Sequence, residues 1–442
     1  MKLTKLVLSI LADDLYQHSR ARSCLVKKTQ DSQYTLISYF SYFLLIMKHY
    51  SFDEVICRKG TNCSKIRALQ MLYGRTDLIP LWVADMDFAT PPFILEALRE
   101  RLQHPILGYT CIDDDYFPAI IDWQKSLHNW DIEKEWISFM PGVIRGLGFA
   151  LQVFTKPGDR IITQPPVYHM FRHVIEGNGR VVVDNPLIRM EDGHYEMDFD
   201  HLATVANDVK MLVLCNPHNP SGRCWPKETL QRLADFCAAH NILVVSDEIH
   251  ADIALFSARH IPFASVSETA RNNSITFGAP TKTFNCAGVV SSWTVVPNKE
   301  LREPFFKWLV ANEIDCPPMF SPTVAIAAYR HGGEWRKKML HYVEENIDFV
   351  VNYCREHIPG VVARRPEASF LIWLDCRALQ LSHDALNHLF VDEAHLALND
   401  GEMFGQGGEG FMRLNVGVPR SILEKALSQL AQAVTKLHTA QS

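Results

Sequence analysis

Three side chains of complementary chemistry follow short apolar segments in the middle of the chain: the amide of Asn219, the carboxylate of Asp247 and the amine of Lys282. A lysine amine can condense with an aldehyde to form a Schiff base. A carboxylate beside a pyridine nitrogen keeps that nitrogen protonated, so that the ring accepts electron density. An amide can donate to an oxygen on the same ring. Together the three groups suit a pyridine ring that carries an aldehyde.

Each of these residues has a simpler interpretation when it is taken alone. A single lysine is usually a solvent-exposed surface residue. A single aspartate at the end of a strand often caps a helix or forms a turn. Asn-Pro segments are usually turns. The chemical interpretation therefore depends on the order and spacing of Asn219, Asp247 and Lys282 together.

The segments around these residues predict a parallel sheet. From about residue 140, short β-branched runs alternate with longer amphipathic runs, which is typical of strands separated by helices on both faces of a sheet. Ligands of such sheets bind beyond the carboxyl ends of the strands, where the three residues fall. The predicted strands are 160–163, 180–183, 211–215, 243–246 and 274–277.

Six motifs between residue 48 and the C-terminus carry a resemblance to a known family. The first three resemble the pyridoxal 5′-phosphate (PLP) signatures of fold-type I, aminotransferase-like enzymes. The other three are similar to the bacterial cystathionine β-lyase, or C–S lyase, branch of that family. In this order the motifs are Asn216–Gly222, Ser246–His250, Pro280–Asn285, Val83–Phe88, Leu107–Thr110 and Gly410–Asn415.

The resemblance implies roles around the ring of PLP. Lys282 is the catalytic Schiff-base lysine, Asp247 the partner of the pyridine nitrogen and Asn219 the partner of the ring oxygen. His250 lies toward that same oxygen, and Tyr168 stacks on the face of the ring.

The resemblance also implies contacts to the phosphate and the substrate. Backbone N–H groups at Val143 and Ile144, which we expect to open a helix after Gly142, cradle the phosphate. Thr281 adds a hydroxyl. Tyr109 reaches the phosphate from a neighbouring subunit, which implies a homodimer with shared active sites. Arg413 binds the α-carboxylate of the substrate, a planar group that suits a planar guanidinium.

Two positions depart from the pattern of many aminotransferases. Ala279 stands where a phosphate-binding serine is common, and Val290 stands where a phosphate-binding arginine is common. The loss of the arginine fits the lyase branch.

The expected fold class is α/β of PLP fold-type I, with a large domain around a mostly parallel seven-stranded sheet and a smaller α/β C-terminal domain. We expect a non-native or disordered N-terminal extension before Met47, which reads as a natural start. The expected divisions are residues 1–46 for the extension, 47–95 for a segment that joins the small domain, 96–333 for the large PLP-binding domain and 334–442 for the small domain.

The composition is that of an ordinary globular protein, with 47% hydrophobic and 21% charged residues. A formal net charge of −6 gives no general attraction to nucleic acid or to anionic lipid, so we expect neither partner. The eleven cysteines form no CxxC pair and no Cys/His cluster at zinc spacing. We therefore expect a reduced, cytoplasmic protein without a metal site.

The resemblance implies α,β-elimination of cysteine S-conjugates, for instance of cystathionine to homocysteine, pyruvate and ammonia. Two alternatives stay open at this point. An aminotransferase shares the fold, the cofactor and the first half of the chemistry. A regulatory binding protein would use the same fold to hold a protein partner.

Overall fold

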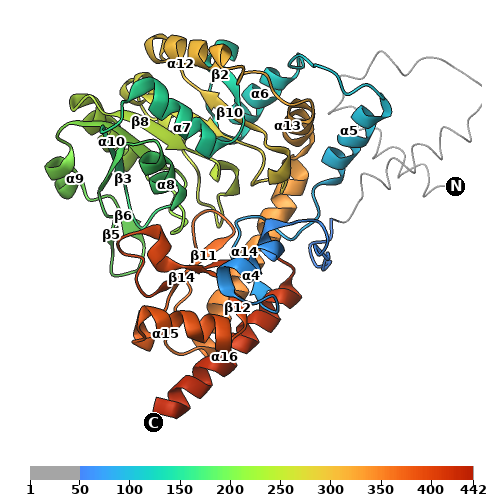
Figure 1. Cartoon of the computed structure of the whole chain (residues 1–442), viewed down its shortest axis with the longest axis vertical. Helices are drawn as coiled ribbons and strands as arrows, with labels where there is room; N and C mark the ends of the chain where they lie inside the picture. Colours follow the sequence, from blue (N-terminus) through green and yellow to red (C-terminus); the bar gives the residue numbers. More distant parts are fainter. Residues whose placement is uncertain (1–49, 442) are drawn as a thin grey trace, which may run out of the picture. The chain divides into compact units, whose positions relative to one another are not determined.

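A mixed seven-stranded sheet forms the centre of the structure, a computed structural model that describes residues 50–441 (Figure 1). Strand β10 is antiparallel to both of its neighbours, and the other adjacent pairs are parallel. The strands run in the order β2 (Ile137–Met140), β10 (Ser292–Val295), β9 (Ser274–Gly278), β8 (Leu243–Asp247), β7 (Val209–Cys215), β3 (Arg160–Thr163) and β4 (Val181–Asp184).

Helices cover both faces of this sheet because alternate strand residues point to opposite sides. Met211 and Val213 pack with α7 (Val143–Phe154), α8 (Met170–Gly177) and α12 (Lys299–Ala311). Leu212 and Leu214 pack on the other side. The helices there are α9 (Phe199–Val205), α10 (Lys227–Ala239) and α11 (Glu268–Asn272). The predicted mostly parallel, seven-stranded sheet covered by helices is confirmed.

The C-terminal part is built on a second, smaller sheet. Its strand order is β11 (Leu371–Asp375), β14 (Phe411–Asn415) and β13 (Asn399–Asp400), all antiparallel. The long helix α14 (Gly333–His357) precedes it, and α16 (Arg420–Gln441) closes the chain.

The N-terminal segment joins this C-terminal part through a short parallel pair. Strand β1 (Ile79–Pro80) pairs with β12 (Leu396–Ala397), and the nearby α4 (Leu69–Tyr73) lies beside β12 in Figure 1. The domain boundaries at residues 96 and 334 stay predictions, and the predicted extension 1–46 lies outside the described residues. The other helices and strands are α3 (Ser64–Arg67), α5 (Pro92–Gln103), α6 (Tyr116–His128), α13 (Phe320–His331), α15 (His383–His388), β5 (Ile188–Arg189) and β6 (Tyr195–Glu196).

Within residues 50–441, no helix combines the length and the apolar character that crossing a bilayer requires.

Candidate active site

The ends of three neighbouring strands meet at one cavity of about 300 Å³. Asp247 is the last residue of β8, Asn219 follows β7, and Lys282 follows β9. Since these strands are parallel neighbours, their carboxyl ends bring the three side chains to the same edge of the sheet. A cavity of this size is within the usual range for sites that bind small molecules.

Most of the predicted site residues line this cavity. Arg413 and Tyr109 are the two that do not. The predicted residues that line it are Val143, Ile144, Tyr168, Asn219, Asp247, His250, Thr281 and Lys282.

Lys282 is held at the cavity by a backbone oxygen of a distant segment. Its Nζ donates a hydrogen bond of 2.5 Å to the carbonyl oxygen of Ala84. Burial lowers the pKa of the Lys282 amine to about 8, although the negative charges of Asp85 and Asp247 act in the opposite direction. The neutral amine, which is the nucleophilic and basic form, therefore makes up about a tenth of the population at pH 7, far more than for an ordinary lysine.

Asp247 is a buried carboxyl group without a cation in direct contact among the described residues. Its Oδ1 accepts a hydrogen bond of 3.1 Å from the backbone N–H of Ile249. Burial raises the pKa of this carboxyl group to about 7. A buried carboxylate is stable only with a charged partner, so this position is suited to a protonated ring nitrogen.

His250 is buried and electrically neutral. Burial, together with the positive charges of Lys282 and Arg413, lowers its pKa to about 3. Its Nδ1 is buried and has no hydrogen-bond partner within residues 50–441. His250 lines the cavity, so its ring lies where a ligand would be bound.

The predicted helix after Gly142 is present as α7, which begins at Val143. Gly142 has a φ of 114° at this turn, a conformation that favours glycine. The first N–H groups of a helix have no partner inside it and carry a partial positive charge, so they bind anions. Val143 and Ile144 supply such groups at the cavity wall.

Arg413 lies behind Asn219 and does not reach the cavity wall. Its Nη1 donates to Oδ1 of Asn219 at 3.0 Å, and its Nη2 donates to the carbonyl oxygen of Trp82 at 3.0 Å and to Oδ1 of Asn399. Burial lowers the pKa of the guanidinium to about 10. The Asn219 oxygen is thus occupied, which leaves its amide nitrogen as the group for a ligand.

Tyr109 does not line the cavity of its own chain. Its side chain is completely exposed, on a stretch before α6 that also exposes Ile106 and Leu107. Its predicted role from a neighbouring subunit is not tested by one chain and stays a prediction.

The residues present fit PLP. The lysine amine, the carboxyl group of Asp247 and the ring of His250 line one cavity, with the beginning of α7 at its wall. These groups match an aldehyde, a ring nitrogen, a ring oxygen and a phosphate, respectively. Among residues 50–441, no group of three or more His, Cys, Asp and Glu side chains is arranged to hold a metal ion.

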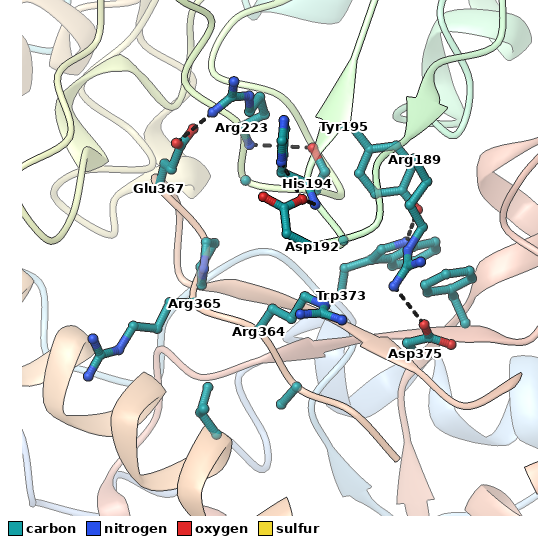
Figure 2. Close-up of a pocket in the computed structure, with 17 residues that line it drawn as sticks. Arg189, Asp192, His194, Tyr195, Arg223, Arg364, Arg365, Glu367, Trp373 and Asp375 are labelled. Atoms are coloured by element: carbon teal, nitrogen blue, oxygen red, sulfur yellow. Dashed lines mark hydrogen bonds and ion pairs between the residues drawn. The ribbon is translucent and has the colours of Figure 1, made fainter. Parts of the chain in front are cut away.

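A second cavity, of about 390 Å³, lies elsewhere and contains none of the predicted site residues (Figure 2). Three of its four arginines are already paired with carboxylates: Arg223 with Glu367 at 2.6 Å, Arg189 with Asp375 at 2.9 Å and Arg365 with Asp348 at 2.5 Å. It offers no buried amine next to a carboxylate, so it does not suit the chemistry of the first cavity.

Sequence reasoning missed three contributors to the site. Ala84 lies in the quoted motif Val83–Phe88, but only the structure shows that its carbonyl oxygen accepts from Lys282. Arg145, one residue after the predicted phosphate contacts, lines the same cavity as Val290, and its Nη1 donates to the carbonyl oxygen of Pro141 at 2.8 Å. Asn399, which accepts from Arg413, lies on a two-residue strand that no periodicity could have marked.

Comparisons with known proteins agree with this geometry. The family model described as aminotransferase class I and II matches residues 76–430. The chain is similar to the cystathionine beta-lyase PatB of Bacillus subtilis, with 42% identity over 87% of this chain and 100% of the relative. It is similar in structure to cystalysin from Treponema denticola, which contains PLP, with a TM-score of 0.84, 32% identity and coverage of 88% and 99% of the two chains. The PLP-bound C–S lyase from Staphylococcus hominis gives a TM-score of 0.82, with 30% identity over 87% and 98%.

Proposed function

The chain belongs to the aminotransferase class I and II family, and from this premise we infer that it is a PLP-dependent carbon–sulfur lyase. It eliminates the thiol from cysteine S-conjugates such as cystathionine, which yields homocysteine, pyruvate and ammonia. The observation that carries this function is the convergence of Lys282 and Asp247 on one cavity, since an amine and a buried carboxyl group are what PLP chemistry requires.

Bound PLP supplies a sink for the electron pair that is left at Cα of the substrate. Asn219 would hold the ring oxygen. The planar guanidinium of Arg413 suits the α-carboxylate of the substrate, which would have to replace one of the present partners of Arg413, namely Asn219, Asn399 or the carbonyl oxygen of Trp82. Lys282 Nζ, with a pKa near the working pH, takes the proton from Cα. The Cβ–S bond breaks, and the same Nζ returns a proton to the departing sulfur. The released enamine is hydrolysed to pyruvate and ammonia.

Elimination is expected to need no second substrate. The purified, PLP-loaded enzyme should release pyruvate from cystathionine at a steady rate without any keto acid, as measured with a coupled lactate dehydrogenase assay. A panel of other S-substituted cysteines, measured in the same way, would define the substrate range.

An aminotransferase is the second candidate, because the matching family is described by that activity. It would give no catalytic pyruvate release without a keto-acid acceptor, and acceptor-dependent amino transfer in its place would contradict the lyase assignment.

We also propose a homodimer with shared active sites. The exposed apolar side chains of Ile106, Leu107 and Tyr109 support it, because they lie together on one segment. Light scattering of the purified chain should give twice the mass of the chain, and Tyr109→Ala should weaken PLP binding. A monomer of full activity would contradict this proposal.

A cytoplasmic location and a regulatory protein partner complete the proposed function. The cysteines that the structure describes are free thiols, in keeping with a reducing compartment. A regulatory partner would be supported by a complex that forms equally well with the Lys282→Ala variant, since a surface contact does not need the reaction.

A further inference from the structure

Six of the seven carbonyl oxygens of the segment Trp82–Phe88 accept hydrogen bonds from side chains. Two of the donors, Lys282 and Arg413, belong to the proposed reaction, so the position of this one segment fixes both of them. The carbonyl oxygens accept from Arg413 at Trp82, from Asn415 at Val83 and Asp85, from Lys282 at Ala84, and from Asn285 at Met86 and Phe88.

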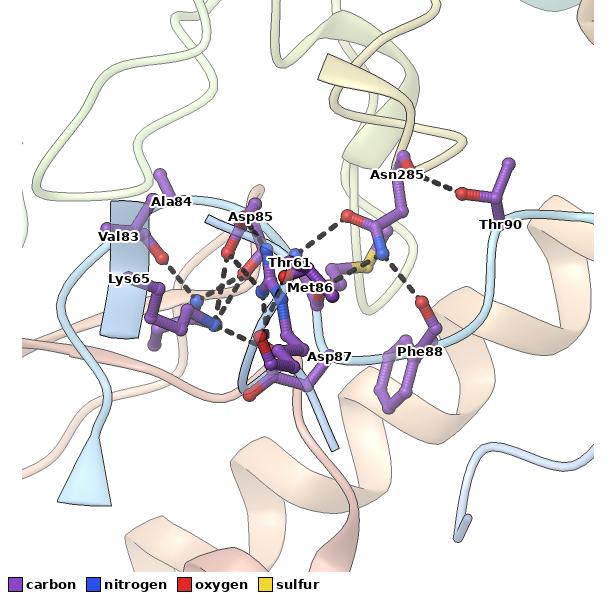
Figure 3. A network of polar contacts seen from close by, with 12 residues as sticks. Thr61, Lys65, Val83, Ala84, Asp85, Met86, Asp87, Phe88, Thr90 and Asn285 are labelled. Atoms are coloured by element: carbon purple, nitrogen blue, oxygen red, sulfur yellow. Dashed lines mark hydrogen bonds and ion pairs between the residues drawn. The ribbon is translucent and has the colours of Figure 1, made fainter. Parts of the chain in front are cut away.

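Four charged side chains anchor this segment, and we call Arg58, Lys65, Asp85 and Asp87 the ion cluster. Arg58 donates to both carboxylate oxygens of Asp85, at 2.7 and 3.1 Å, and to Asp87 at 2.7 Å. Lys65 Nζ lies 3.1 Å from Asp85 Oδ1 and 3.0 Å from Asp87 Oδ1. Figure 3 shows Lys65 and both aspartates pointing toward one another beside Ala84.

Lys65 is the most constrained member of the ion cluster. Its side chain has 0% exposure, and its Nζ also donates to the carbonyl oxygen of Asp85 at 3.1 Å. An ammonium group has three donors, and a buried one is tolerated only when it is fully paired. Its backbone oxygen in turn accepts from Trp82 Nε1 at 3.0 Å. Lys65 therefore ties both ends of the Trp82–Asp85 stretch to α3.

We propose that the ion cluster is a positioning device for the reaction: it fixes the carbonyl oxygens of Trp82 and Ala84, and through them Arg413 and Lys282. None of the four residues of the ion cluster lines the cavity. The proposal rests on the proposed function and adds to it the residues that set the place of the catalytic amine. The charges act on Lys282 as well, because Asp85 raises the pKa of its amine and Lys65 lowers it.

Two substitutions test the proposal in the PLP-loaded enzyme, one that removes a positive charge from the ion cluster and one that removes a negative charge. Lys65→Met and Asp85→Asn should each lower kcat/KM for pyruvate release by about tenfold or more, with a lower kcat and a higher KM, because both Lys282 and Arg413 lose their alignment. The pH midpoint of the visible absorbance change, in which the Lys282 nitrogen titrates, should rise by about 0.5 to 1 unit in Lys65→Met and fall by a similar amount in Asp85→Asn.

A purely structural role would not move the two midpoints in opposite directions. Lys125→Met is the matched control, because Lys125 pairs with Asp131 at 2.6 Å on the surface and both side chains are at least half exposed. It should leave the rate and the midpoint unchanged. If Lys65→Met does not fold, Arg58→Gln at the partly exposed end of the ion cluster is read in the same way.

Two results would overturn the proposal: a folded Lys65→Met enzyme with kcat/KM within twofold of the unmodified enzyme, or midpoints that shift in the same direction. Failure of the proposed function is distinguishable, since an enzyme that releases no pyruvate from any substrate still shows the absorbance titration.

Discussion

Lys282→Ala should abolish both the visible absorbance of the bound cofactor and the release of pyruvate, with a loss of about 10⁴-fold or more in rate. The size of the effect follows from two roles in one amine, which forms the covalent link to PLP and moves the proton between Cα and sulfur. Alanine leaves neither a nucleophile nor a base at the cavity. Absorbance spectra of protein purified with PLP, and the pyruvate assay, measure the two losses separately.

The matched control for this substitution is Lys210→Ala, because Lys210 is an exposed residue of β7 on the same sheet. It should keep both the absorbance and the rate. Pyruvate release by Lys282→Ala at even a hundredth of the normal rate would contradict the assignment of Lys282, since another base would then have to serve.

The sequence was sufficient for the parts of the site that depend on strand order. Asn219, Asp247 and Lys282 each follow a short apolar run, and runs of this kind form neighbouring parallel strands whose ends coincide. The turn at Gly142 and the helix after it were predicted from the family resemblance, because the Pro-Gly pair alone is a weak local signal, and both are present. The predicted strand 180–183 is shifted by one residue to Val181–Asp184.

The rest of the site depends on contacts between segments that are hundreds of residues apart. Arg413 meets Trp82 across 331 positions, and Lys282 meets Ala84 across 198. No periodicity encodes such pairs, because they arise only when the N-terminal segment packs against β14 of the C-terminal sheet and against the loop after β9 of the central sheet. The buried Lys65 is a further example, since a lysine in a sequence reads as a surface residue until its carboxylate partners are seen.

Asp247→Asn should retain PLP at the cavity and lower kcat by about 10²- to 10³-fold. Asparagine has nearly the same shape as aspartate, but its neutral amide cannot keep the ring nitrogen protonated, so the ring becomes a poor sink for electrons. Asp252→Asn is the matched control: Asp252 is also buried, yet it pairs with His128 at 2.9 Å and does not line the cavity. We expect it to lower the Tm while the rate per folded enzyme stays near normal.

The Asp247→Asn substitution, which lowers the activity, should raise the stability of the protein from which PLP has been removed. The folded protein holds the Asp247 proton with a pKa of about 7, against 3.8 for the ordinary group, so stability is lost as pH rises from about 4 to about 7, by about 1.4 kcal/mol per unit. The asparagine amide of the variant has no proton to lose, and the variant should therefore gain Tm over the original chain across that interval and keep the gain above pH 7. A Tm difference that is independent of pH would mean that the pKa of Asp247 is not raised in the folded protein. Asp247 would then lose its support as the partner of the protonated ring nitrogen of PLP.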